Sequence, residues 1–209
     1  MNHRRTHQFH GTDLRRVQCR SRIFWILSVF LPLLAQVRDL HAQDVVVRET
    51  PLKAAYIYNF AKYVQWPAAS TKLVGTENPI VCGVYGPSAL EVYLQKIAAK
   101  KTVNGRPIAV HRYDSVANLG QANILFVPAS VSDVDYQRIV QALANTSTML
   151  FGERMDLADN NSVTFYIESN RVKFQINLEN TEAAGLQISS KVLQLGRLVR
   201  GHELVRAGE

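Results

Sequence analysis

The segment from Ser162 to Leu198 constrains the fold more than any other part of this chain, because its first half holds two alternating apolar runs around a short turn. The apolar positions are Val163, Phe165, Ile167, Val172, Phe174 and Ile176. A two-residue loop at Ser169-Asn170 sets each of them opposite an apolar partner, with Phe165 facing Phe174. A slip of one residue would break all of these pairs at once. The sequence therefore predicts an antiparallel β-hairpin with one apolar face.

The second half of the same segment has the spacing of a helix. Asn177 is suited to cap its start, and Gly185 interrupts it. Apolar residues then recur at helical intervals, at Ile188, Val192, Leu195 and Val199. We expect a closing helix that lies across the apolar face of the hairpin and completes a core. Residues 200–209 are expected to form a frayed tail.

Residues 1–42 have the composition of a secretory signal peptide. Arginines such as Arg15 and Arg16 precede an apolar run from Ile23 to Ala35, and Leu40-His41-Ala42 ends the segment in the manner of a signal peptidase site. An uncleaved membrane anchor is the alternative, although the apolar run is short for a bilayer. We expect residues 43–209 to form one exported domain.

Removal of this leader also removes most of the positive charge. The whole chain carries a net charge of +7 from 24 basic and 17 acidic residues. Residues 1–42 contain seven of the arginines and only two acidic residues, which leaves 17 basic and 15 acidic residues, a net charge of +2. A balance so close to neutral does not indicate binding to nucleic acid. Cys19 leaves with the leader, and we expect the remaining Cys82 to be buried in a strand.

Helices and strands alternate between the leader and the hairpin. The predicted strands are Ile80–Tyr85, Pro107–Arg112, Asn123–Val127 and Thr148–Phe151, and the predicted helices are Leu52–Gln65, one that starts after Gly86-Pro87 and one that Ser132 caps. Residues 43–50 are expected to be extended, and residues 156–162 to form a polar loop. This order predicts an α/β fold, a single-domain sandwich in which helices flank a mixed sheet, with a C-terminal β-hairpin and a closing helix.

No residue pattern indicates catalysis, a metal or a cofactor. His111 and His202 are the histidines that follow the leader, and neither has the neighbouring ligands of a metal site. Ser189-Ser190-Lys191 lacks the flanking sequence of a nucleophile elbow, so a hydrolase is disfavoured. The sequence predicts a protein that is not an enzyme.

The predicted first helix carries an aromatic stripe made by Tyr56, Phe60, Tyr63 and Trp66. Such a stripe could line a ligand pocket, but aromatic residues at helical spacing more often pack in a core. Core packing is the favoured interpretation, and the pocket is kept as the alternative.

Several stretches of the chain, in order, resemble the YfiR family of bacterial exported proteins. They are Leu52–Pro67, Val81–Gly86, Gly105–Pro107, Asn123–Val127, Arg171–Asn177 and Ala184–Leu193. Together they extend over nearly all of the chain that follows the leader. The first and last stretches together are quite specific.

The resemblance implies a periplasmic, non-enzymatic α/β protein that tends to dimerise. The best understood relatives bind the periplasmic part of a YfiN-type membrane diguanylate cyclase and hold it inactive, which lowers cyclic di-GMP and biofilm formation. An outer-membrane lipoprotein of the YfiB type can sequester the repressor. The alternative is an extracytoplasmic small-molecule-binding sensor domain with no cyclase partner.

The chain departs from its relatives in its cysteines. Many relatives have a cysteine just before the strand at Asn123–Val127, where this chain has Ala122, and a second pair found in some members near residues 151–162 is also absent. Control by a disulfide is therefore not expected here, whereas control by a partner or a ligand remains open.

A repressor of this kind needs a contact surface. The outer face of the predicted hairpin and the loop before it provide one, and we expect Leu157, Glu168 and Gln175 to contact the partner. Under the alternative, Tyr56, Phe60, Tyr63 and Trp66 would form the wall of a ligand pocket.

Overall fold

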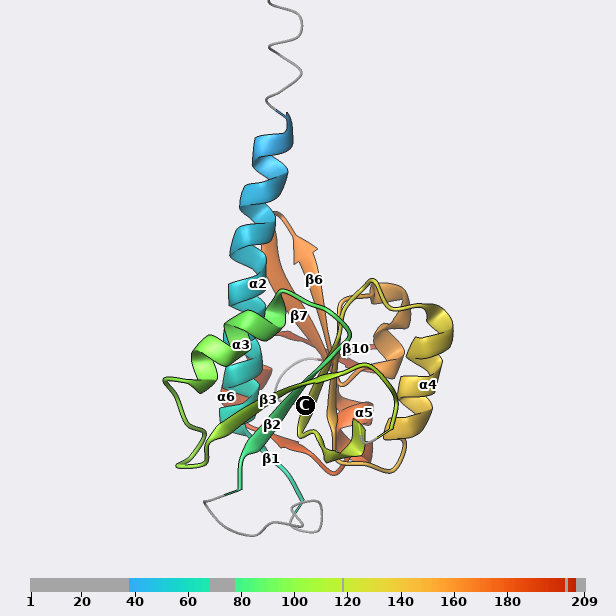
Figure 1. Ribbon diagram of the computed structural model, residues 1–209. Coiled ribbons are helices and arrows are strands. Elements are labelled where there is room, and N and C mark those ends of the chain that lie inside the picture. Colours follow the sequence, from blue (N-terminus) through green and yellow to red (C-terminus); the bar gives the residue numbers. More distant parts are fainter. Residues whose placement is uncertain (1–37, 68–77, 118, 202, 206–209) are drawn as a thin grey trace, which may run out of the picture. The chain divides into compact units, whose positions relative to one another are not determined.

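The computed structural model describes residues 38–67, 78–117, 119–201 and 203–205 (Figure 1). The predicted signal peptide lies outside the described residues except for residues 38–42, and Cys19 and His202 lie outside them as well. The chain divides into two units, Met1–Asp44 and Val45–Glu209. Every strand described belongs to the second unit.

An eight-stranded mixed sheet forms the centre of the second unit. Its strands are β2 (Ile80–Tyr85), β3 (Ile108–Tyr113), β4 (Ile124–Val127), β5 (Met149–Gly152), β6 (Val163–Glu168), β7 (Arg171–Asn177), β9 (Arg197–Arg200) and β10 (Glu203–Val205). They lie in the order β10-β9-β7-β6-β5-β4-β2-β3. The β6–β7 and β9–β10 pairs are antiparallel, and the other pairs are parallel. The prediction of an α/β fold with a mixed sheet flanked by helices is confirmed.

The hairpin has the register that its apolar pattern predicts. Phe165 pairs with Phe174, Val163 with Ile176, and Glu168 with Arg171. At the turn, Ser169 and Asn170 have φ values of 50° and 59°. Positive φ at both central residues matches the right-handed twist of the two strands, so the turn and the apolar pairing specify the same register.

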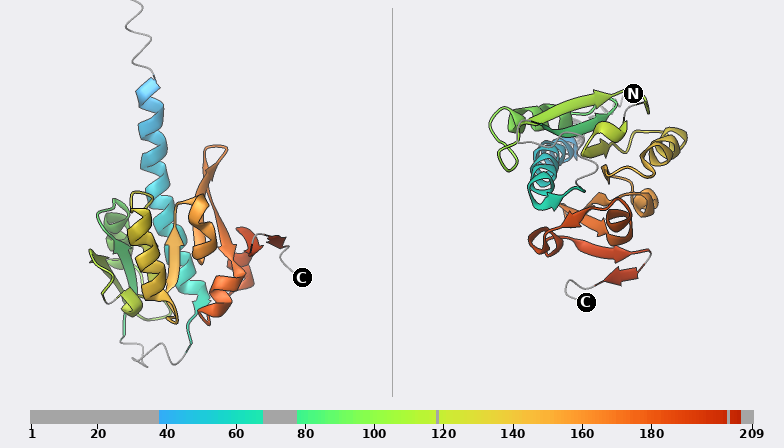
Figure 2. Two further views of the ribbon diagram at one scale, coloured as in Figure 1. Left: turned by 90° about the vertical axis from the view of Figure 1, so that its right-hand side faces the viewer. Right: turned by 90° about the horizontal axis from the view of Figure 1, so that it is seen from below.

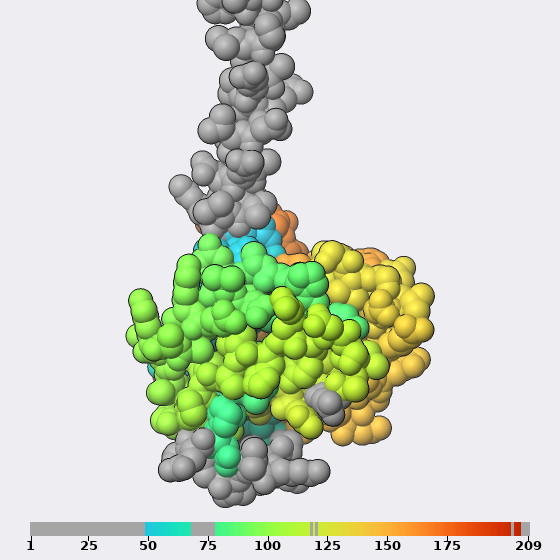
Figure 3. Space-filling model, in the orientation of Figure 1, coloured from blue at the N-terminus to red at the C-terminus, as the bar shows by residue number. Residues whose placement is uncertain are grey.

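Helices cover both faces of the sheet (Figures 1 and 2). On one face lie α3 (Leu90–Ala98) and the part of α2 (Arg38–Tyr63) that belongs to the second unit, and on the other lie α4 (Asp133–Leu143) and α5 (Leu178–Ala183). Ser132 caps α4 as predicted, because its side chain accepts a hydrogen bond from the Asp135 N–H. The side of the molecule seen in Figure 3 is formed by α3 and β3, with α4 beside them.

An aromatic cluster joins α2 to the apolar face of the hairpin. The ring of Phe60 lies 5.1 Å from that of Phe151 and 5.3 Å from that of Phe174, and the ring of Tyr56 lies 5.0 Å from that of Phe174. These edge-to-face contacts are favourable beyond the area that they bury. The helix that covers the hairpin is therefore α2, from the start of the domain, and the expectation that a C-terminal helix lies there is wrong.

The residues after the hairpin form several short elements instead of one closing helix. They are α5, β8 (Gln187–Ile188), α6 (Ser190–Leu193), β9 and β10. Asn177 caps α5 as predicted, accepting a hydrogen bond from the Asn180 N–H. Gly185 then has φ +69°, a value at which a helix commonly ends. Beyond it, Val199 belongs to a strand, and the expected frayed tail forms β10 at residues 203–205.

The start of the domain also differs from the prediction. Residues 43–50 are helical, because α2 begins at Arg38 and includes Pro51, and Val64–Gln65 forms β1, which pairs with β8. The β-branched run at residues 45–47 favours an extended chain, but adding residues to an existing helix gains one hydrogen bond for each residue fixed. The expected loop at residues 156–162 is largely a 3-10 helix, η3 (Met155–Asn160).

Candidate functional site

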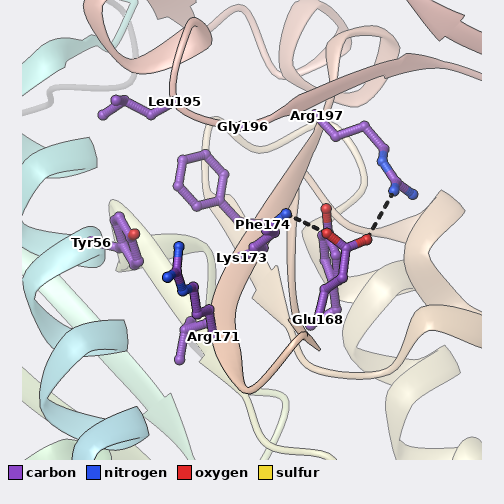
Figure 4. A pocket seen from close by; sticks show the side chains of 10 residues that line it. Tyr56, Glu168, Arg171, Lys173, Phe174, Leu195, Gly196 and Arg197 are labelled. Atoms are coloured by element: carbon purple, nitrogen blue, oxygen red, sulfur yellow. Dashed lines mark hydrogen bonds and ion pairs between the residues drawn. The ribbon is translucent and has the colours of Figure 1, made fainter.

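A groove of about 460 Å³ lies between α2, the turn end of the hairpin and the segment that leads into β9 (Figure 4). It is lined by Tyr56, Tyr166, Glu168, Arg171, Val172, Lys173, Phe174, Leu195, Gly196 and Arg197. The groove thus combines a rim of charged side chains with a floor of aromatic and aliphatic ones. Such a surface can hold a molecule that has both anionic and apolar parts.

Glu168 is held between two of the cations in this groove. The Lys173 ammonium donates a hydrogen bond to its carboxylate, and Nη2 of Arg197 lies 3.8 Å from Oε1 of Glu168 (Figure 4). The hydrogen bond from Lys173 and the positive charges of Lys173 and Arg197 hold the pKa of Glu168 below its usual value. Glu168 is therefore ionised at neutral pH and already occupied by partners within this chain.

Arg197 is oriented from a second direction as well. Its guanidinium lies 5.2 Å from the centre of the Tyr166 ring, within the range of a cation–π contact. Arg171 is the third cation of the groove and extends from the hairpin on the side that faces Tyr56 (Figure 4). Three cationic side chains thus accompany a single carboxylate, and the groove has an excess of positive charge.

The three predicted partner contacts do not lie in one patch. Glu168 lines the groove, but Gln175 is only 7% exposed, and it pairs with Thr164 on one side and with Arg197 on the other. Leu157 lies in η3 and packs half-buried on the core cluster under α4. The outer face of the hairpin is covered near Thr164, where the buried Asn161 side chain donates a 3.0 Å hydrogen bond to the threonine hydroxyl.

The four aromatic residues of α2 and its end do not form one pocket either. Tyr56 lines the groove, whereas Phe60 is buried in the aromatic cluster. Tyr63 is contacted by the Lys62 and Lys191 ammonium groups, and the Trp66 indole donates a hydrogen bond to the Asn123 carbonyl at 3.2 Å. The arrangement agrees with core packing for Phe60 and leaves Tyr56 as the single member of the stripe at the groove.

The most informative groove residue that the sequence did not indicate is Arg197. Its position follows from the pairing of β9 with β7, whereas the sequence pattern had placed this segment in a helix. Leu195 was expected to face the core, but it is 65% exposed at the edge of the groove. The cations Arg171 and Lys173 were visible on the outer face of the predicted hairpin, without any sign of what they surround.

Two other polar clusters in the described part of the chain join elements that are far apart in sequence. Lys53 is 7% exposed and pairs with Glu49 and Glu153, and the Glu153 carboxylate also accepts the Ala129 N–H at 3.0 Å. Tyr136 donates a hydrogen bond to the buried Asn161. Desolvation by burial raises the pKa of Tyr136 to about 12. Within the described ranges, no group of three or more His, Cys, Asp or Glu residues could hold a metal ion.

Cys82 and the Ser189-Ser190-Lys191 stretch are the two further candidates for chemistry that the sequence offered. Cys82 is buried in β2 as predicted, and burial raises the pKa of its thiol to about 12, which suppresses the reactive thiolate. The Ser189 hydroxyl accepts the Lys191 N–H as the cap of α6, and the Lys191 ammonium points to the Tyr63 ring, 5.9 Å from its centre. Nothing in this arrangement activates a serine.

Comparisons with known proteins identify one family. The family described as YfiR/HmsC-like matches residues 50–197. No curated protein is similar enough to count as a match. In the part of the chain that the structure describes, none of the helices has both the length and the apolar character needed to cross a membrane.

Two solved structures resemble part of this chain at low identity. One is the ABC domain in complex with L-Trp from Streptococcus pneumonia, with 11% identity and a TM-score of 0.41, over 57% of this chain and 56% of that one. The other is a conserved domain protein from Vibrio cholerae O1 biovar El Tor, with 13% identity and a TM-score of 0.41, over 58% of this chain and 55% of that one. The chain spans little more than half of each, and likenesses this distant carry no conclusion about function.

Proposed function

The chain belongs to the YfiR/HmsC-like family, and we propose that it represses a membrane diguanylate cyclase by direct contact in the periplasm, so lowering cyclic di-GMP and biofilm formation. The observation that carries this proposal is the family match over residues 50–197. Membership of this family indicates a periplasmic regulator of cyclic di-GMP signalling. It indicates a regulatory protein rather than a catalyst.

The described surface suits a protein that acts by contact. The groove at the hairpin offers charged and apolar side chains together, while the one described cysteine is buried and unreactive. Ala122, which stands where many relatives have a cysteine, is buried as well. Regulation through a partner therefore fits this chain better than regulation through a disulfide. The proposal includes a homodimer and, as a second partner, an outer-membrane lipoprotein of the YfiB type.

A second candidate function, small-molecule sensing without a cyclase partner, is favoured by one observation. The groove has the volume of a small-molecule site, and Tyr56 and Tyr166 line it. A ligand that binds the native state raises the melting temperature in proportion to the logarithm of its concentration above the Kd. A thermal-shift screen against aromatic metabolites tests this candidate, and an Arg197→Gln variant should lose any shift caused by an anionic ligand in the groove.

The repressor proposal is tested first by measuring cyclic di-GMP in the host with and without this gene. Deletion should raise cyclic di-GMP, and the exported chain supplied in trans should lower it again. A chain that lacks residues 1–42 and stays in the cytoplasm should fail to restore repression. Crosslinking in the periplasm should then recover a membrane diguanylate cyclase. Unchanged cyclic di-GMP on deletion would refute the proposal.

A further inference from the structure

One stretch of β7 has an open edge. On the side away from β6, β9 pairs with β7 only from Gln175 to Asn177, and no described strand lies beside the residues that precede them. The edge beside Phe174, the residue before Gln175, is covered by Gly196. The Gly196 backbone lies so close that a Cβ atom there would be 2.3 Å from the Phe174 ring. The free edge is therefore Arg171 to Lys173, and it borders the groove.

A free strand edge offers backbone N–H and C=O groups to another extended chain. A peptide that pairs with such an edge gains affinity from main-chain hydrogen bonds and specificity from the pockets that receive its alternate side chains. Here the free edge continues the line of β9, so an added strand would fill the gap that β9 leaves beside β7. The segment that binds must be extended.

The charges around this edge define the chemistry of the incoming side chains. Arg171, Lys173 and Arg197 surround it, and Glu168 is the one carboxylate among them. Lys173 and Arg197 are paired with Glu168, whereas Arg171 forms no ion pair with any described residue. Carboxylates on the added segment would meet Arg171 directly and would compete with Glu168 for the other two cations.

The apolar side of the groove defines which residues of the bound segment can lie between its carboxylates. Successive side chains of a strand point to opposite faces, so residues that alternate with the carboxylates would face the apolar lining residues Val172 and Leu195. Leu195 is 65% exposed and has room to be covered. The complementary segment therefore alternates acidic and apolar residues.

We propose that the free edge of β7 and the adjoining groove bind an extended segment of the partner in which acidic and apolar residues alternate, and that Glu168 is an internal anion which the partner's carboxylates displace. This inference rests on the proposed function, under which the segment belongs to the periplasmic part of the cyclase. Glu168 is then a competitor for the cations and not itself a contact with the partner.

The test uses two sets of short synthetic peptides and the purified exported chain. One set tiles the periplasmic parts of the host's membrane diguanylate cyclases, and the other has random sequences of graded net charge with alternating apolar positions. Binding is measured by fluorescence anisotropy for the parent chain, for the single variants Arg197→Gln and Glu168→Gln, and for the triple variant Arg171→Gln/Lys173→Gln/Arg197→Gln. Lys101→Gln, an exposed cation outside the groove, is the matched control.

Acidic peptides should bind, and affinity should rise with the number of carboxylates. Arg197→Gln should weaken binding by about 2- to 5-fold, and the triple variant by about tenfold or more, as expected for charge pairs at a surface. Glu168→Gln should strengthen binding by about 2- to 5-fold, because it frees two cations. Lys101→Gln should change nothing. Proline placed along a bound peptide should abolish binding at alternate positions, since it removes one main-chain donor to the edge.

Each contrary outcome has a distinct meaning. Binding that ignores peptide charge, or that weakens in Glu168→Gln, would overturn the inference. So would inorganic phosphate or citrate displacing the peptides more strongly than chloride at equal ionic strength, since the groove would then be a small-anion site. If the random acidic set binds as described and no cyclase peptide does, the edge takes acidic extended chains as inferred, and its occupant is not a segment of the cyclase.

Discussion

Lys53 and Glu153, which are a hundred residues apart in the chain, form an ion pair with an Nζ–Oε1 distance of 2.7 Å. The pair ties α2 to the end of β5, and the same Glu153 carboxylate accepts the N–H of Ala129 after β4. It therefore fastens the helix that covers the hairpin to the parallel half of the sheet.

Replacing Glu153 by glutamine should destabilise the chain by about 1–3 kcal/mol, because the nearly buried Lys53 loses one of its two carboxylates. Chemical denaturation measures the change. Glu91→Gln is the control, since Glu91 pairs at 3.6 Å with a half-exposed Arg112 and should matter by less than about 0.5 kcal/mol. Equal effects of the two changes would contradict the role assigned to the buried pair.

Gly196→Ala should destabilise the chain by about 1–3 kcal/mol, because the added methyl group overlaps the Phe174 ring. A double variant with Phe174→Leu should cost less than the sum of the two single changes, since the smaller side chain makes room for the methyl group. Thermal or urea unfolding of the four chains completes the cycle. Strict additivity would mean that the two residues do not meet.

Alkaline stability should depend on Cys82. Its pKa is raised from 9.0 to about 12 in the folded chain by burial, so the unfolded chain releases this proton first as pH rises. The contribution of the protonated Cys82 thiol to the free energy of unfolding is fully present below pH 9. It is lost between pH 9 and about 12, at about 1.4 kcal/mol per pH unit. Cys82→Ala should therefore show a shallower fall of unfolding free energy in this window, even if it is less stable at neutral pH. An unchanged slope would contradict burial of the thiol.

Arg197→Gln should weaken repression in the host without unfolding the chain, because Arg197 is exposed and the groove loses one of its three cations. Cyclic di-GMP should lie between the levels of the parent and the deletion strains. The Lys101→Gln chain, expressed to the same level, should repress as the parent does. Full repression by Arg197→Gln would separate the groove from the regulatory function.

Residues 1–42 should direct export. Fused to alkaline phosphatase, which is active only after export, they should give activity, and a fusion without the apolar run from Ile23 to Ala35 should give none. Mass spectrometry of the chain recovered from the periplasm should find a start near residue 43. Recovery of the intact chain from the membrane fraction would favour an uncleaved anchor.

The sequence predicted the hairpin well, because its register is set by neighbours in the chain and by a two-residue turn that tolerates positive φ. It predicted the alternation of strands and helices for the same reason, since β2, β4 and α4 carry clear local patterns. The apolar spacing from Ile188 to Val199 predicts one helix but is equally compatible with the short elements β8, α6 and β9 that form there. Which of these forms depends on contacts with β7 and with the distant α2.

Individual residues of the groove could be predicted from the sequence, but their arrangement could not. The sequence indicates Glu168 as a partner contact and Tyr56 as part of a ligand pocket, and both line the same groove. Their meeting depends on α2 lying over the hairpin, and the position of Arg197 depends on β9 adding to β7. Both are contacts between residues far apart in sequence, and no local pattern specifies them.

The open edge at Arg171 to Lys173 also affects whether copies of this chain associate with one another. An unpaired strand edge tends to join the same edge of an identical molecule, which leads to aggregation. If two copies met here in antiparallel pairing, Arg171 and Lys173 of each would face the same cations of the other, and like charges placed opposite each other are destabilising. Repulsion between these cations therefore disfavours antiparallel pairing of the edge with itself, while an acidic segment would meet no such repulsion.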